Sequence, residues 1–252
     1  MHPGDVLKLR GAFSPTLSHI VLVSLSIVGA LFVGALAPAA RAQLTSLRVE
    51  NYATAPLTGS VSATSNNPVY LARVNFMADN PANTNQFFVN DLNGPLYILD
   101  KQQKTFTTYL DFNGRGGRPG LFPKFTFELN FATGLTSFIF DPDYAKNGVL
   151  YTLHMEDPAT DAPAAPKAGV VAGLDLTGYT TTPAITTPTV GGRIDREVAL
   201  IEWRDRDLSN VTFEGTAREL MRLQHPLPQH PLGEMTFNPT ARRGDPDWRV
   251  MY

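Results

Sequence analysis

The chain has 252 residues, of which 43% are hydrophobic and 17% charged, and its formal net charge is −2. This balance excludes a strongly basic nucleic-acid-binding protein and a disordered acidic chain, and it is typical of a packed globular protein. The sequence contains 20 glycines, 20 prolines and no cysteine. Because no disulfide can form, the stability of the protein must come from its packed core.

The amino-terminal residues 1–42 have the organisation of a secretory signal peptide. A basic segment with Lys8 and Arg10 precedes an apolar stretch at residues 20–36, and a small-x-small pattern ends at Ala42. We therefore expect cleavage after Ala42 and a periplasmic or extracellular mature protein. An uncleaved membrane anchor is the alternative, because the apolar stretch approaches the roughly 20 residues that span a bilayer.

The rest of the chain divides into an extended lead-in, residues 43–67, and a β-rich domain, residues 68–252. The domain contains short runs of β-branched and aromatic residues bounded by Gly, Pro, Asn or Asp. Residues 217–223 also carry a helical alternative, because Thr216 and Glu219 could form a capping box. Short strands without helices predict an all-β sandwich, barrel or propeller. The twelve runs expected as strands are 69–77, 86–90, 96–101, 106–112, 124–130, 135–140, 149–155, 169–176, 197–203, 217–223, 233–238 and 248–252.

The clearest single element is a β-hairpin in residues 134–156. Strand-like residues 135–140 and 149–155 flank an eight-residue connector with many turn-forming side chains. Within the connector, Pro142 biases the preceding residue away from helix, and Gly148 tolerates positive φ just before the second strand. The connector is therefore expected to adopt a single, defined conformation.

This hairpin resembles the first-blade signature of the glucose/sorbosone dehydrogenase family, the soluble quinoprotein sugar dehydrogenases. The likeness rests on the Gly-Leu pair at Gly134, on DPDYAKNG at residues 141–148 and on Val-Leu-Tyr at residues 149–151. A preceding hairpin at residues 87–101 and a later stretch at residues 210–220 follow in the family's order. The resemblance implies a six-bladed β-propeller. At four strands per blade, twelve strands would make about three blades, so we expect roughly the first half of such a ring.

The candidate for chemistry is His230. The family places its catalytic histidine in a His-x-x-Gly segment that runs into a strand, and His230 and Gly233 match this pattern. The resemblance implies that His230 is the general base for a sugar or polyol hydroxyl, while pyrroloquinoline quinone takes the hydride. An exposed histidine without a role is the other interpretation of this proline-rich loop. We expect His225 to be structural and His154 to lie at the surface or at the base of a loop.

Two positions depart from the family pattern. Ala132 stands where the family has a Gln or Glu just before its Gly-Leu pair, a side chain that contacts the quinone and substrate region in that family. Asp141 stands where the family usually has His. Asp141 leaves the hairpin match incomplete. Ala132 favours the alternative function, a non-catalytic extracellular β-propeller binding protein that keeps the scaffold without the chemistry.

The resemblance also implies cofactors and partners. It implies pyrroloquinoline quinone and calcium, but the family's ligands for both lie in later blades. We therefore assign no cofactor-binding or metal-binding residue, and we expect the 252-residue chain alone to be inactive. The implied partners are a small sugar or polyol and an electron acceptor, with no nucleic acid and no membrane after signal cleavage.

Overall fold

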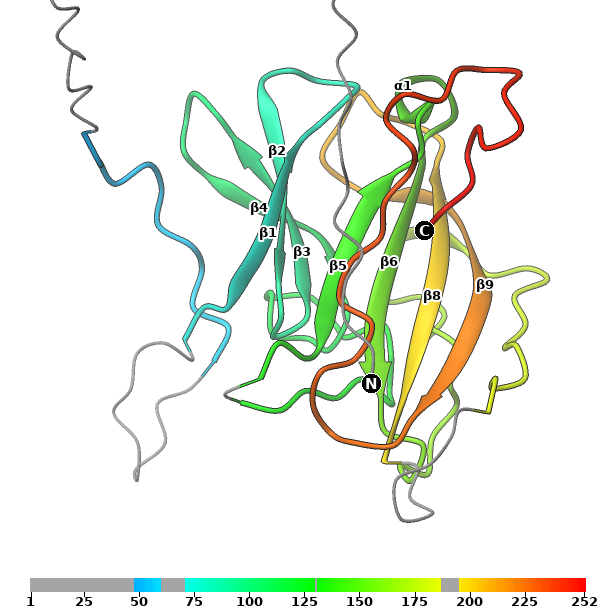
Figure 1. Ribbon diagram of the computed structural model, residues 1–252. Coiled ribbons are helices and arrows are strands. Elements are labelled where there is room, and N and C mark those ends of the chain that lie inside the picture. Colours follow the sequence, from blue (N-terminus) through cyan, green and yellow to red (C-terminus); the bar gives the residue numbers. More distant parts are fainter. Residues whose placement is uncertain (1–47, 60–70, 130, 187–194) are drawn as a thin grey trace, which may run out of the picture. The chain divides into compact units, whose positions relative to one another are not determined.

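The computed structural model describes residues 48–59, 71–129, 131–186 and 195–252, and all structural statements below concern these residues. The predicted signal peptide and most of the predicted lead-in lie outside them. Val49–Tyr252 forms one compact unit. Two β-sheets with one short helix make up this unit, which confirms the all-β class (Figure 1). Within the described ranges, no helix has both the length and the apolar character needed to cross a bilayer.

The first sheet is an antiparallel meander whose four strands follow one another in the chain. Its strands are β1 (Val74–Asp79), β2 (Gln86–Asp91), β3 (Pro95–Asp100) and β4 (Phe106–Asp111). β2 and β3 pair in register from Gln86 opposite Asp100 to Asn90 opposite Leu96. The hairpin predicted for residues 87–101 is therefore confirmed.

The second sheet has the strand order β5-β6-β8-β9-β7. Its four long strands form a second antiparallel meander, and the short β7 runs parallel to β9 at the edge. The strands are β5 (Leu135–Phe140), β6 (Val149–Glu156), β7 (Gly173–Asp175), β8 (Arg196–Asp205) and β9 (Glu214–His225).

The predicted β5–β6 hairpin is confirmed, and its connector contains the single helical turn α1 (Tyr144–Asn147). Gly148 ends this turn with φ +65°, in the left-handed region that favours glycine. A Cβ atom at Gly148 would lie 2.0 Å from the carbonyl oxygen of Asp205, so the close approach of the two chain segments also requires glycine.

Several predicted strands are shorter or absent. Of the predicted strand at residues 124–130, the described residues 124–129 contribute only an isolated bridge from Phe125 to Glu156. The predicted strands at residues 233–238 and 248–252 meet in one bridge between Phe237 and Met251. Phe125 is held by packing against the core, which replaces a strand ladder. The predicted run 169–176 reduces to β7. The strand interpretation of residues 217–223 is confirmed within β9, so the helical alternative is wrong.

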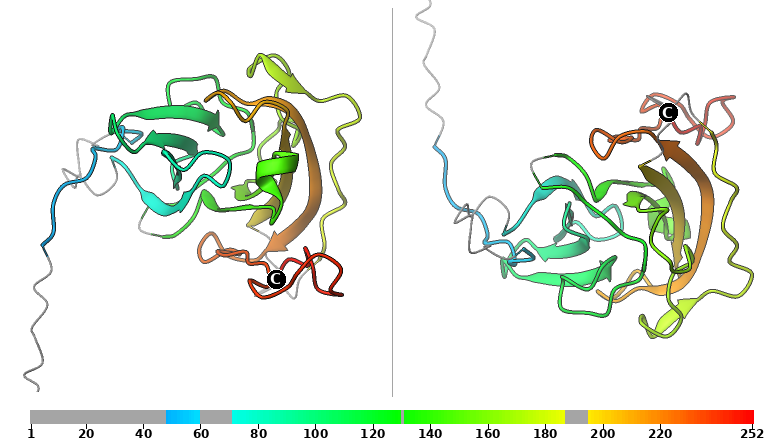
Figure 2. Two further views of the ribbon diagram at one scale, coloured as in Figure 1. Left: turned by 90° about the horizontal axis from the view of Figure 1, so that it is seen from above. Right: turned by 90° about the horizontal axis from the view of Figure 1, so that it is seen from below.

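Buried side chains from both sheets form the main hydrophobic core. Figure 2 shows the two sheets that supply them from above and from below. Phe88 from β2 packs edge-on against Tyr109 of β4 and Phe140 of β5, with ring centroids 5.0 and 4.9 Å apart. Burying each large apolar side chain contributes about 1.5–3 kcal/mol. The Tyr109 hydroxyl also donates a buried hydrogen bond to Asp205, which joins the first sheet to β8. Burial raises the pKa of Tyr109 well above its usual value, so this donor keeps its proton.

A second hydrophobic cluster covers the other face of the second sheet. Val149, Leu153 and Val198 pack there against Met235 and Met251. The residues that follow β9 therefore cover a sheet face that the main core does not use.

Candidate functional site

His230 lies in the connection that follows β9, and its side chain is exposed. Its ring packs edge-on against Phe131, with 5.7 Å between the ring centroids. The loop after β9 therefore meets the residues that lead into β5. His230 has φ +54°, a left-handed conformation that is uncommon outside glycine. Strained residues of this kind concentrate at functional sites, so the backbone geometry makes His230 a candidate independently of the sequence motif.

His225 lies close to His230 but contacts its backbone. The His225 Nε2 atom is 3.0 Å from the His230 carbonyl oxygen, and Nδ1 is 2.6 Å from the carbonyl oxygen of Leu227. The structure thus brings two of the predicted histidines together. His230 is exposed, and the His225 ring contacts the backbone of the turn. This geometry agrees with the expected structural role of His225.

A groove with a volume of about 620 Å³ runs beside this loop. Strands β1 and β5 and the segment just after His230 form its walls. A volume of this size suits a small molecule. The lining side chains mix amide, hydroxyl and carboxylate groups with aromatic and aliphatic groups: Asn75, Phe76, Thr136, Ser137, Phe138, Ile139, Glu234 and Met235, with Gly233 between them.

Side-chain hydrogen bonds join β5 to β1, to β2 beside it and to the segment after His230. Asn75 Nδ2 on β1 donates to the carbonyl oxygen of Thr136 on β5 at 2.9 Å, and Asn90 Nδ2 donates to the carbonyl oxygen of Leu135 at 2.6 Å. The Thr136 hydroxyl lies 3.0 Å from the carbonyl oxygen of Leu232. Because Leu232 is two residues after His230, this contact ties the histidine loop to the edge of β5.

The two departures from the family pattern have different surroundings. Ala132 is exposed beside Phe131, and its methyl group cannot hydrogen-bond. Asp141 is buried; its Oδ1 accepts a 2.9 Å bond from Asn147 Nδ2, and its Oδ2 accepts a 2.7 Å bond from Arg249 Nε. Burial opposes the positive charge of Arg249, but the hydrogen bond and charge of Asp141 raise the arginine pKa. Asp141 therefore organises its own loop and anchors the carboxyl-terminal segment.

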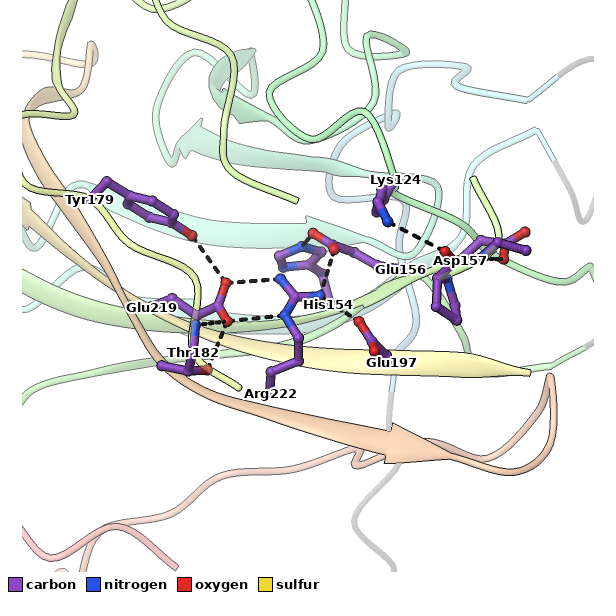
Figure 3. A network of polar contacts seen from close by, with 11 residues as sticks. Lys124, His154, Glu156, Asp157, Tyr179, Thr182, Glu197, Glu219 and Arg222 are labelled. Carbon is purple, nitrogen blue, oxygen red and sulfur yellow. Dashed lines mark hydrogen bonds and ion pairs between the residues drawn. The ribbon is translucent and has the colours of Figure 1, made fainter. Parts of the chain in front are cut away.

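A network of buried ionisable side chains joins strands of the second sheet and was not predicted from the sequence (Figure 3). On β6, His154 Nε2 lies 3.0 Å from Glu156 Oε1. Arg222 on β9 donates through Nη1 to Glu156 Oε2 at 2.7 Å and through Nη2 to Glu219 Oε2 at 2.8 Å. Glu197 on β8 accepts a third bond from Arg222 at 3.0 Å. The His154 and Glu156 side chains are fully buried, so the prediction that His154 lies at the surface or at a loop base is wrong.

The electrostatics of this network favour ion pairs. Burial acts to raise the pKa of Glu156, but the hydrogen bond and charge of His154 and the charge of Arg222 lower it overall. Glu219 Oε1 also accepts a 2.9 Å bond from the backbone N–H of Thr182, which attaches the segment before β8. Because Glu156, Glu219 and Arg222 are buried, we assign the network to cross-linking β6, β8 and β9.

The described residues do not by themselves fit the calcium site that the resemblance implies. Calcium takes about six to eight oxygen ligands. In the described part of the chain, no three His, Cys, Asp or Glu side chains are grouped closely enough to hold a metal ion. None of the described residues is therefore assigned to calcium or to the quinone.

No protein-family model matches the chain, and no curated protein is similar to it. The functional interpretation therefore depends on the site itself and on the motifs quoted above.

Proposed function

We propose that this protein is an exported quinoprotein-type dehydrogenase that oxidises a sugar or polyol hydroxyl, with His230 as the general base. The contact between His230 and Phe131 carries the proposal. Phe131 leads into the strand that begins with the family-like Gly-Leu pair, and His230 opens the His-x-x-Gly segment. Two motifs that are distant in the sequence, and that the resemblance assigns to one catalytic centre, thus lie side by side next to a groove.

The order of the strands supports a propeller scaffold for this site. Each sheet contains a four-stranded antiparallel meander, the usual form of a propeller blade. The first strands of the two meanders, β1 and β5, face each other across the groove, and residues 233–235 form its third wall. In a propeller the first strands of successive blades surround the central axis. We propose that the groove is part of that axis.

His230 has the chemistry that a base requires. An alcohol that gives up a hydride must also lose its hydroxyl proton, and a neutral imidazole accepts a proton near pH 7. The exposed ring of His230 can then release the proton to water. Its packing against Phe131 restricts the orientation of the ring, which a positioned base needs.

Substitution of His230 tests this role in the protein translated from its complete reading frame. His230→Ala is expected to lower quinone-dependent turnover by roughly 10²–10⁴-fold, the usual contribution of one general base. Its thermal stability should change little, because an exposed ring buries little area. Gln229→Ala, in the same loop, is the matched control and should keep full turnover. Equal turnover of the His230→Ala variant and the parent would exclude His230 as the base.

The alternative function, a non-catalytic binding protein, is favoured by Ala132. The exposed methyl group stands beside Phe131 where the family has a hydrogen-bonding side chain. A binding protein would take up a sugar without reducing a dye, and His230→Ala would not change any redox activity. Isothermal titration with sugars, run beside the dye assay, separates the two functions.

A further inference from the structure

The groove between β1, β5 and the segment after His230 is lined by a single ionisable side chain, that of Glu234. Glu234 follows His230 by four positions in the sequence, and its side chain is exposed. Within the described ranges, its carboxylate has neither a hydrogen-bond partner nor an ion-pair partner. The described wall of the groove therefore carries a negative charge that these residues do not neutralise.

Ser137 on β5 adds a second polar group that faces the groove. The residue is only 5% exposed, yet it belongs to the groove lining. Its hydroxyl forms no hydrogen bond with the described residues and stays accessible from the groove. The adjacent Thr136 differs, because its hydroxyl already donates to the Leu232 carbonyl oxygen at 3.0 Å. A hydroxyl or an amine of a ligand can therefore pair with Ser137.

Phe76 on β1 supplies an aromatic surface in the same groove. Its side chain is 45% exposed, although it is large and apolar, and its ring lies 5.3 Å from that of Phe138. The face of an aromatic ring attracts a cation, because the ring quadrupole is negative there. The aromatic ring and the Glu234 carboxylate thus favour the same sign of charge on a ligand.

A negatively charged ligand finds no counterpart in the described lining. None of the nine lining residues is cationic. The nearest arginine in the sequence is Arg73, just before β1, and its guanidinium donates to Asn93 Oδ1 at 3.3 Å and to the carbonyl oxygen of Glu128 at 3.2 Å. A carboxylate or phosphate in the groove would lie beside Glu234 without a compensating cation, and like charges placed together oppose binding.

We propose that Glu234 determines ligand specificity, and that the groove selects a polyhydroxy compound with a protonated amine, an amino sugar, over neutral and acidic sugars. The ammonium group donates charge-assisted hydrogen bonds to the Glu234 carboxylate, and the sugar hydroxyls pair with Ser137 and with the Oδ1 atom of Asn75. The Nδ2 atom of Asn75 is already bonded to β5. The binding preference follows from the groove alone, whereas oxidation of the bound amino sugar rests on the proposed function.

Isothermal titration of the protein translated from its complete reading frame tests the preference without any assay of activity. The ligands are glucosamine, glucose and glucuronate, compared at about pH 6, where an amine of this kind is protonated. Glucosamine should bind roughly tenfold more tightly than glucose, the effect of about one charge-assisted hydrogen bond. Glucuronate should bind more weakly than glucose. Added salt should reduce both differences, because it screens charges near the surface.

Substitution of Glu234 assigns the preference to one carboxylate. Glu234→Gln keeps the size of the side chain and removes its charge, so the variant should bind glucosamine and glucose equally well. Glu234→Lys should reverse the order and favour glucuronate. Glu214→Gln, an exposed position on β9 outside the groove lining, is the matched control and should keep the parental order. Because both glutamates are exposed, the variants should melt at the temperature of the parent.

Equal binding of the three sugars by the folded parent, or no binding of any of them, would overturn the proposal. A preference for glucosamine that survives in Glu234→Gln would overturn it as well. A preference that depends on Glu234 in a protein without sugar oxidation would leave the selectivity standing and refute the proposed function. Sugar oxidation with the same KM for glucosamine and glucose would refute the selectivity alone.

Discussion

At the scale of single residues, two arginines on β9 show how burial changes the contribution of an ion pair to the stability of the fold. The Arg222 side chain is 4% exposed and pairs with Glu156 and Glu219, which are fully buried. The Arg218 side chain is 66% exposed and pairs with Glu202. An exposed pair is screened by water, whereas removal of a buried cation leaves its carboxylates both unpaired and desolvated.

Replacing each arginine by leucine should therefore have unequal effects. Arg222→Leu is expected to lower the free energy of unfolding by about 3–5 kcal/mol, the usual cost of breaking one side of a buried pair. Arg218→Leu, the matched control on the same strand, should cost less than about 1 kcal/mol. Urea denaturation followed by tryptophan fluorescence measures both values. Similar small losses in the two variants would show that the buried network does not stabilise the sheet.

Glu156 makes the stability of the protein depend on pH. Its folded-state pKa lies below the ordinary 4.5, because the bonds and charges of His154 and Arg222 outweigh burial. The unfolded chain therefore binds the proton more readily than the folded protein. The stabilisation is fully present above pH 4.5 and is lost as the pH falls through the lower folded pKa.

The measurement is the urea concentration at which half of the protein is unfolded, taken at pH 7 and at successively lower pH below 4.5. The parent should lose stability across that range. Glu156→Gln, which cannot titrate, should be less stable at pH 7 and should show a flatter pH dependence. Parallel curves for the two proteins would contradict the assignment to Glu156.

At the scale of elements, β9 shows why the buried network could not be predicted. Its inward residues alternate through Ala217 and Glu219, but Arg222 also points inward although it is three positions further on. A register shift opposite Leu200 and Ile201 leaves Leu220 as an extra residue. Such a bulge reverses the alternation, so Glu219 and Arg222 share a face. The residue pattern indicated a strand, but not where its ladder would be interrupted.

The β5–β6 connector can be tested at Gly148. Gly148→Ala should destabilise the protein by more than the roughly 1–2 kcal/mol of a left-handed alanine, because the new Cβ would also collide with the Asp205 carbonyl. Gly178 is the matched control, since it has φ +77° and no atom within 4 Å of the place that a Cβ would occupy. Gly178→Ala should show the conformational cost alone. Calorimetric melting of both variants checks the prediction, and equal losses would exclude a steric role for the close approach.

At the scale of the whole molecule, features with local causes were predictable and long-range contacts were not. Turn chemistry around Gly94 and Gly148 was enough to predict two hairpins. The pairing of β6 with β8 and the contact between Phe131 and His230 join distant parts of the chain. Only the family resemblance suggested that His230 belonged near the start of β5. Asp205 ends β8 in a run of charges of alternating sign, a pattern typical of a solvated edge, yet it is buried and bonded to Tyr109, because the core between the two sheets closes over it.

The most direct test of the central claim is reconstitution of the protein translated from its complete reading frame. The purified, folded protein is supplied with pyrroloquinoline quinone and calcium, and reduction of an artificial electron acceptor is followed on addition of sugars and polyols. We predict saturable quinone binding and substrate-dependent reduction, with His230→Ala retaining the binding and losing the reduction. Absence of both quinone binding and substrate-dependent reduction in a folded preparation would contradict the account.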